Sequence, residues 1–211
     1  MQGIDFTGVF IQFLILVLSL SVHEAAHAWS ADRLGDPTAR LLGRVSLNPA
    51  VHVDPIGTIL FPLLAMFTGV PLLGWAKPVP VSTRNLHGNW RQKYVLIAAA
   101  GPASNLILAG LAALVLRAMT FGSPLEAVAG IGERVLFFTV ALNVLLAVFN
   151  MVPVPPLDGG NVLSGLLSGP AAESFDRIRP YGFIIIYALM LTGVLFSIIG
   201  PIENALVSLL I

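Results

Sequence analysis

The sequence predicts an all-α polytopic membrane protein, and three observations carry this prediction. Hydrophobic residues make up 56% of the 211 residues and charged residues only 10%, whereas soluble domains carry about 25% charged residues. The mean hydropathy of +0.89 leads to the same conclusion. Long apolar stretches recur along the whole chain. Because lipid offers no water to an open backbone, such stretches must be helical.

The charge balance and the lack of cysteine exclude several classes of function. Eleven basic and eleven acidic residues give a formal net charge of zero, so the positive excess of a nucleic-acid-binding protein is missing. No cysteine is present, which excludes disulfides, thiolate nucleophiles and cysteine-ligated metals. The high hydrophobic fraction also excludes a disordered chain.

The apolar stretches predict about four to six membrane helices. A spanning helix needs about 20 apolar residues. The uninterrupted stretches are residues 6–29, 94–119, 131–151 and 181–199. Another stretch, 56–75, contains Pro62, Gly69 and Gly74, which predicts a re-entrant segment. No long polar insertion separates these stretches, so residues 1–211 are expected to form a single intramembrane domain.

The distribution of Lys and Arg predicts how the chain lies in the membrane. If residues 56–75 dip into the bilayer and return, nine basic residues lie on one side and only Arg117 and Arg134 lie near the other. Basic loops favour the cytoplasmic side of a membrane. We therefore expect the re-entrant arrangement, with the loop after the first helix facing the cytoplasm.

The first apolar helix contains the pattern H-E-x-x-H at His23, Glu24 and His27. Residues four apart share a helix face, so the two imidazoles can bind one Zn²⁺ while Glu24 acts as a general base. A charged group in a membrane helix costs about 2.5–3.5 kcal/mol on insertion scales, and such groups are usually functional. A buried hydrogen-bonded cluster or a proton relay is the structural alternative.

A hydrolytic zinc site has three protein ligands and one open position. His52 and His87 lie outside the apolar helices, so the best third candidate is Asp158, which follows the proline-rich residues 153–156. Irregular backbone at membrane depth occurs only against protein or a water-filled cavity. The alternative for Asp158 is a surface turn or the start of a short helix over residues 160–168.

Three motifs together resemble those of the site-2 proteases, the intramembrane zinc metalloproteases. They are H-E-A-A-H at residues 23–27, G-P-A-S-N at residues 101–105, and the segment from Asn150 to Asp158-Gly159. The resemblance covers about residues 6–168, the expected catalytic core. It is closest to the compact prokaryotic branch, without a PDZ or cystathionine-β-synthase domain.

The resemblance implies that His23, His27 and Asp158 bind one Zn²⁺ per chain and that Glu24 is the catalytic base. It also implies that Asn150 helps to hold the substrate, while Asn105 supports the site. The implied partners are membrane-spanning protein substrates and the lipid bilayer, recognised through the membrane core or a separate adaptor. The implied location is a prokaryotic inner membrane, with the active site toward the cytoplasm.

Several other polar residues receive structural interpretations. Residues 38–47 have strand-like stretches around Gly43 and are followed by the turn pair Asn48-Pro49, which predicts a small β-hairpin after the first helix. This hairpin is either a surface feature or an edge that pairs with an extended substrate. Thr139 and Asn143 are assigned to hydrogen bonds between helices, His52 to a solvated loop, and His87 with Trp90 to an anchor among lipid headgroups.

The predicted function is therefore hydrolysis of peptide bonds in or near the membrane-spanning segments of substrate proteins, by a zinc metalloendopeptidase. The alternative from another class is a small transporter or a proton or cation relay that uses the buried His and Glu side chains. A protease-like scaffold that binds partners without cleaving them is a third hypothesis.

Overall fold

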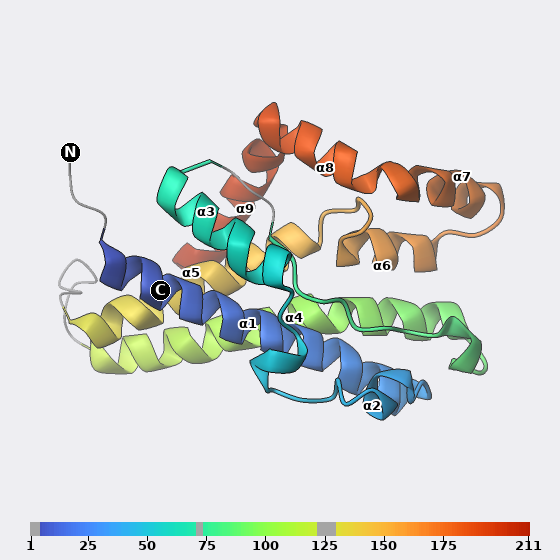
Figure 1. Cartoon of the computed structure of the whole chain (residues 1–211), viewed down its shortest axis with the longest axis horizontal. Helices are drawn as coiled ribbons and strands as arrows, with labels where there is room; N and C mark the ends of the chain where they lie inside the picture. Colours follow the sequence, from blue (N-terminus) through green and yellow to red (C-terminus); the bar gives the residue numbers. More distant parts are fainter. Residues whose placement is uncertain (1–4, 71–73, 122–129) are drawn as a thin grey trace.

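The computed structural model describes residues 5–70, 74–121 and 130–211, and its regular structure is helical throughout these ranges. Within these ranges, three helices are long and apolar enough to cross a membrane: α1 (Phe6–Leu34), α4 (Trp90–Met119) and α5 (Ile131–Asn150). They lie side by side along the longest axis of the molecule (Figure 1). This three-helix unit carries most of the predicted site residues.

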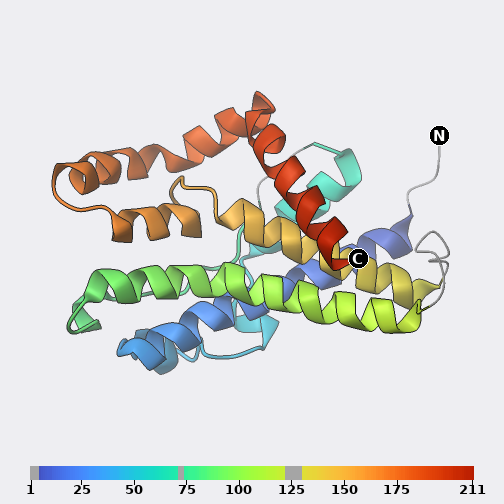
Figure 2. The same cartoon turned by 180° about the vertical axis from the view of Figure 1, so that it is seen from behind.

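A second layer covers the C-terminal end of α5. It contains α6 (Asp158–Leu166), α7 (Pro170–Ile178), α8 (Gly182–Leu191) and α9 (Val194–Leu210). The helical stretch 170–191 and α9 are bent by 76° relative to each other and together are apolar enough for a fourth span. Gly193 lies at this bend with a φ of 74°, a left-handed conformation that glycine adopts without strain. Figure 2, the view from behind, shows α9 crossing in front of α5.

Small residues allow the long helices to approach closely. Ala28 and Ala31 of α1 and Ala109 of α4 have no exposed surface. In a membrane, helices associate through close packing of such small side chains, because lipid supplies no hydrophobic force between them. Pro102 lies within α4 and removes one hydrogen bond of the helix. The packing thus brings polar groups of α1 and α4 into direct contact.

The predicted β-hairpin after the first helix is wrong, because residues 5–70, 74–121 and 130–211 contain no strand. Residues Thr38–Leu41 form the short helix α2, and Pro49–Val51 form the 3₁₀ turn η1. The carboxylate of Asp36 accepts hydrogen bonds from the backbone N–H and the hydroxyl of Thr38. Asn48 likewise caps η1 through the Ala50 N–H. These local side-chain bonds favour turns over strand pairing.

The segment between η1 and α4 turns back on itself. It contains the π-helix η2 (Pro55–Leu60), α3 (Phe61–Thr68) and the 3₁₀ turn η3 (Thr83–Asn85). The backbone N–H of Trp75 donates to the carbonyl of Gly57 at 3.0 Å, and the Thr58 hydroxyl donates to the Trp75 carbonyl at 2.8 Å. The two ends of residues 56–75 therefore lie side by side.

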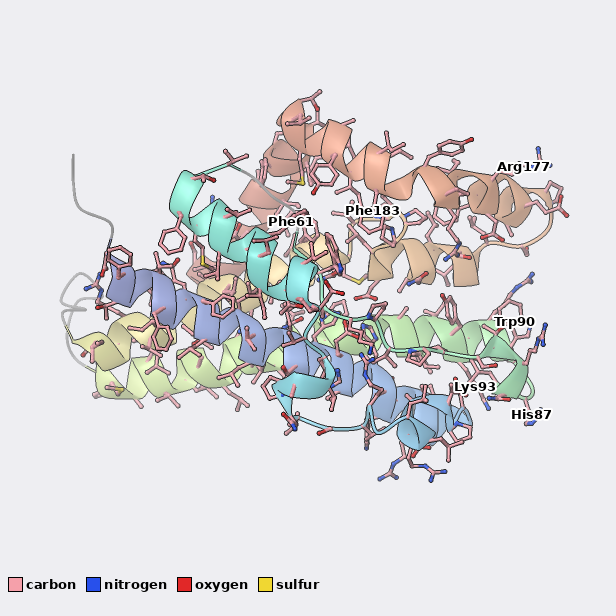
Figure 3. The ribbon with its side chains drawn as sticks, viewed as in Figure 1. Phe61, His87, Trp90, Lys93, Arg177 and Phe183 are labelled. Atoms are coloured by element: carbon pink, nitrogen blue, oxygen red, sulfur yellow. The ribbon has the colours of Figure 1, made fainter. Side chains whose placement is uncertain are left out.

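Residues 74–82, here named the crossing segment, have no regular secondary structure and run alongside the long helices toward η3 (Figure 1). Trp75 of this segment contacts Phe61 of α3 at 5.4 Å and Phe183 of α8 at 6.3 Å between ring centroids. Figure 3 shows Phe61 and Phe183 near each other between the two layers. The aromatic contacts therefore join the crossing segment to both α3 and α8.

Candidate metal centre

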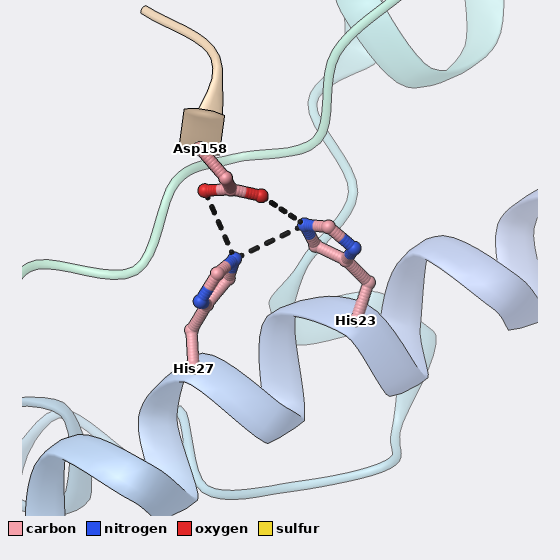
Figure 4. Close-up of side chains that lie close together, drawn as sticks. All are labelled: His23, His27 and Asp158. Carbon is pink, nitrogen blue, oxygen red and sulfur yellow. Dashed lines mark hydrogen bonds and ion pairs between the residues drawn. The ribbon is translucent and has the colours of Figure 1, made fainter. Parts of the chain in front are cut away.

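Three potential metal ligands meet at one point between α1 and α6. His23 and His27 lie one turn apart on α1, and their Nε2 atoms are 3.0 Å apart. The carboxylate of Asp158, at the first residue of α6, lies 3.0 Å from His23 Nε2 and 3.3 Å from His27 Nε2. Figure 4 shows both rings pointing toward this carboxylate. Both histidines are buried, so the cluster is shielded from bulk water.

The second nitrogen of each ring fixes the orientation of that ring. His27 Nδ1 lies 2.7 Å from the carbonyl oxygen of Ile97. A carbonyl can only accept, so His27 carries a proton on Nδ1, and the neutral ring then has its lone pair at Nε2. His23 Nδ1 lies 2.6 Å from Oδ1 of Asn105, which is fully buried on α4. Both rings thus turn Nε2 toward Asp158.

The donor set fits a divalent cation. One donor atom from each of the three residues lies within 4.8 Å of the other two. Tetrahedral zinc with bonds of about 2.0–2.1 Å to nitrogen places its ligand atoms about 3.3 Å apart. Oδ2 of Asp158 is buried and has no hydrogen-bond partner among the described residues. In neutral rings, two lone pairs face this carboxylate, and a metal cation between them would offset their repulsion.

Asp158 is positioned by the two glycines that follow it. A Cβ atom at Gly159 would overlap the carbonyl of Met151, and a Cβ at Gly160 would lie 2.6 Å from the backbone nitrogen of Pro155. Only glycine lets the first turn of α6 lie this close to the loop after α5. The sequence D-G-G therefore sets the position of the carboxylate relative to α1.

Gly101 of α4 lies directly against both imidazoles. A Cβ atom there would overlap His27 Nε2 and would stand 2.6 Å from His23 Nε2. In the sequence, Gly101 begins the second of the three motifs that carry the family resemblance. The structure adds that the atoms packed against Gly101 are the candidate ligand atoms themselves. A residue spacing along one helix does not reveal this contact, because it joins two helices that are distant in sequence.

Glu24 lies beside the cluster but is not one of its three donors. Its side chain is buried, and Oε2 accepts the backbone N–H of Val79, in the crossing segment, at 3.0 Å. This bond links α1 to a residue 55 positions later, which sequence analysis did not anticipate. The carboxylate is thus held in place by one donor while remaining close to the candidate ligands.

Asn150 lies at the last residue of α5, half-buried. Its amide nitrogen donates to the carbonyl of Leu146 in the same helix at 2.9 Å. No side-chain hydrogen bond joins it to the three-donor cluster among the residues that the structure describes. The two other histidines also lie outside the cluster. His52 is buried rather than solvated, with Nε2 2.7 Å from the carbonyl of Ser46, whereas His87 is exposed.

The fold and the site define a class: a helical membrane protein with a buried two-histidine, one-carboxylate centre. Residues 126–193 match the model of Peptidase family M50. The chain is 37% identical over 194 residues to YwhC of Bacillus subtilis, covering 91% of this chain and 85% of that protein. It is 33% identical over 198 residues to Rip2 of Mycolicibacterium smegmatis, covering 92% and 72% respectively. Both relatives are named as zinc metalloproteases.

The chain therefore belongs to Peptidase family M50, the site-2 protease family. This confirms the resemblance drawn from the three sequence motifs. No solved structure matches the chain. The family does not favour the alternative hypothesis of a transporter or a proton relay.

Proposed function

We propose that His23, His27 and Asp158 bind one Zn²⁺ per chain and that Glu24 is the catalytic base of the reaction. As a member of Peptidase family M50, the chain is an intramembrane metalloendopeptidase. The observation that carries the residue assignment is the convergence of two Nε2 lone pairs and one carboxylate at a buried point. That arrangement matches the two-histidine, one-carboxylate ligand set of hydrolytic zinc sites.

A zinc ion held by His23, His27 and Asp158 would supply Lewis-acid chemistry to the scissile carbonyl and to water. Glu24 accepts a proton from the attacking water and then donates it to the leaving amine. The Val79 N–H holds one oxygen of Glu24 and so keeps the carboxylate from rotating away. Burial of Glu24 beside the two histidines strengthens each of these interactions, because the local dielectric constant is low.

Asn150 is proposed to hold the substrate. The substrate must be locally extended, because a helix hides its carbonyls within its own hydrogen bonds. Asn150 ends α5, and its side chain is only half-buried. An amide at this point offers both donors and an acceptor to an extended backbone, once it exchanges its bond to Leu146. The proposed substrates are membrane-spanning proteins, recognised in the membrane core or through a separate adaptor.

We also propose that residues 1–211 act as one domain with a catalytic core over about 6–168, in a prokaryotic inner membrane with the site nearer the cytoplasm. Polar and aromatic residues gather at one end of the molecule, where Figure 3 shows His87, Trp90, Lys93 and Arg177. Trp90 is exposed and lies beneath the Arg91 guanidinium at 5.3 Å. Such residues are typical of the cytoplasmic interface of a membrane.

The test is cleavage of a model single-span substrate by purified protein with Glu24→Gln. Glutamine keeps an oxygen for the Val79 N–H but cannot take the proton. We expect bound zinc to be retained and the cleavage rate to fall by about 10²–10⁴-fold, the usual contribution of a general base. Glu173→Gln is the matched control, since Glu173 is exposed on α7. Cleavage by Glu24→Gln at the wild-type rate would exclude Glu24 as the base.

A further inference from the structure

A chain of buried amides lies behind His23, on the side of the ring away from Asp158. Asn105 of α4 and Asn143 of α5, here named the amide relay, both have no exposed surface. Nδ2 of Asn105 donates to Oδ1 of Asn143 at 2.8 Å. Nδ2 of Asn143 in turn donates to the Thr139 carbonyl and to the Ser19 hydroxyl, each at 2.9 Å. The relay thus connects α1, α4 and α5 at the candidate ligand.

We propose that Asn143 is a positioning residue of the metal centre: through Asn105 it holds the His23 proton on Nδ1, so that the Nε2 lone pair faces the metal. This inference rests on the proposed function, in which His23 is a ligand. It goes beyond the structural role that the sequence assigned to Asn143, a hydrogen bond between helices.

The direction of the relay follows from its last member. The carbonyl of Thr139 can only accept, so the amide nitrogen of Asn143 must face it, and the amide oxygen of Asn143 must face Asn105. The nitrogen of Asn105 must then face Asn143, which leaves its oxygen toward His23. An oxygen at 2.6 Å from His23 Nδ1 requires that this nitrogen carry the proton. The Thr139 carbonyl therefore determines, through Asn143 and Asn105, that Nδ1 of His23 carries the proton.

Turning over the side-chain amide of Asn105 or Asn143 would raise the free energy of the folded protein. If the Asn105 amide turned over, its NH₂ group would face the Nδ1 proton of His23 and its oxygen would face the oxygen of Asn143. Both residues are fully buried, so no solvent can compensate such contacts between like groups. The second hydrogen of the Asn143 amide is used by Ser19, which satisfies the nitrogen completely.

The second histidine provides an internal control. His27 Nδ1 donates directly to the backbone carbonyl of Ile97, which no side-chain substitution removes. A change at Asn143 should therefore disturb His23 and leave His27 unaffected. General loosening of the helix packing would instead affect both rings, because both lie on α1 against α4.

The experiment compares Asn143→Leu, Asn143→Asp and Thr139→Val with the wild-type protein. Leucine removes the acceptor that holds Asn105. A carboxyl group kept neutral by burial keeps the bonds that lead to His23, since its O–H donates to Thr139 and its other oxygen accepts from Asn105; only the donation to Ser19 is lost. Thr139→Val is the matched control in the same turn, because the Thr139 hydroxyl bonds Val135 and only its backbone carbonyl belongs to the relay.

Two quantities are measured: the zinc dissociation constant, by competition with a chelator, and the Nδ1 proton resonances of the histidines in zinc-loaded protein. Loss of a partner that orients a ligand typically weakens metal binding by about 10- to 100-fold. We expect a loss of this size in Asn143→Leu, with an upfield shift of the His23 Nδ1 proton and no shift for His27. Asn143→Asp and Thr139→Val should match the wild type in both quantities.

Wild-type zinc affinity and an unshifted His23 resonance in Asn143→Leu would overturn the inference. If Asn143→Leu does not fold, the Asn143→Asp variant decides. Loss of zinc affinity in folded Asn143→Asp would contradict the inference, because this variant keeps the acceptor for Asn105. A wild-type protein whose His23 Nδ1 proton shows no hydrogen-bonded shift would also overturn it. By contrast, a wild-type protein without zinc, or a His23→Ala variant with unchanged zinc affinity, would contradict the proposed function itself.

Discussion

The three-helix unit of α1, α4 and α5 and the described residues of the connection between α1 and α4, 36–70 and 74–82, lie beside the same site, but different interactions hold them. In the helices, fully buried alanines and Gly101 allow backbones and imidazoles to approach closely. In the connection, single buried side chains bind backbone groups. Asp36, for example, is fully buried and accepts the Ser82 N–H at 2.6 Å and the Asn85 amide at 2.7 Å.

This difference indicates which kind of substitution should destabilise each part most. The helices depend on the absence of side-chain atoms, so enlarging a residue should do the most damage there. The connection depends on individual acceptors, so removing one carboxylate should damage it most. The crossing segment joins the two parts, because its Val79 holds Glu24 of α1. Substitutions that separate these two effects test the comparison.

The largest effect is expected for Gly101→Ala. The new Cβ would overlap the candidate ligand atoms of both histidines. Forcing an extra carbon into a packed site typically costs about 1–3 kcal/mol, so zinc affinity should fall about 10- to 100-fold. Gly110→Ala is the control on the same helix, where no atom lies within 4 Å of an added Cβ. Equal zinc affinity in the two variants would show that close approach at Gly101 is not needed.

A smaller effect, on stability rather than on metal binding, is expected for Asp36→Ala. This change leaves the Ser82 N–H and the Thr38 N–H without their acceptor and removes one of the two acceptors of the Asn85 amide. Each buried donor left unpaired costs about 1–3 kcal/mol. Thermal unfolding in detergent should therefore begin at a clearly lower temperature. Asp176→Ala is the control, since Asp176 is an exposed partner of Arg179, and surface changes usually stay within about 0.5 kcal/mol.

The smallest expected effect is the pH dependence of that same contact. Burial alone would raise the pKa of Asp36, but hydrogen bonds from Thr38 and Asn85 outweigh it and hold the pKa below its usual value. A depressed carboxyl pKa stabilises the folded state above the unfolded pKa of about 3.9, and this stability is lost as pH falls through the folded pKa. The difference in melting temperature between wild type and Asp36→Asn should thus be constant from about pH 6 to 8 and shrink below about pH 4. A difference that grows on acidification would contradict the assignment.

The same difference explains which features of the fold and the site the sequence predicts. The spacing of His23 and His27 predicts a shared helix face because helical periodicity is local. The resemblance to the family rests on three short motifs that can be read directly in the sequence. The hairpin failed because Asp36 and Asn48 cap short turns, which a strand-like pattern around Gly43 does not reveal. The contact of Gly101 with both imidazoles and the bond from Val79 to Glu24 were not predicted, because each joins residues far apart in the chain. The hydrogen bonds of Asn143 to other helices were predicted and are present.

The central claim is that His23, His27 and Asp158 hold one zinc ion together. The most direct measurement is the zinc content per chain of purified wild-type protein, Asp158→Ala and the exposed-site control Asp176→Ala. We expect about one zinc per chain in the wild type and the control, as for a single hydrolytic site, and strong depletion in Asp158→Ala. Full zinc occupancy in Asp158→Ala, or a wild-type protein that binds no zinc, would contradict the claim.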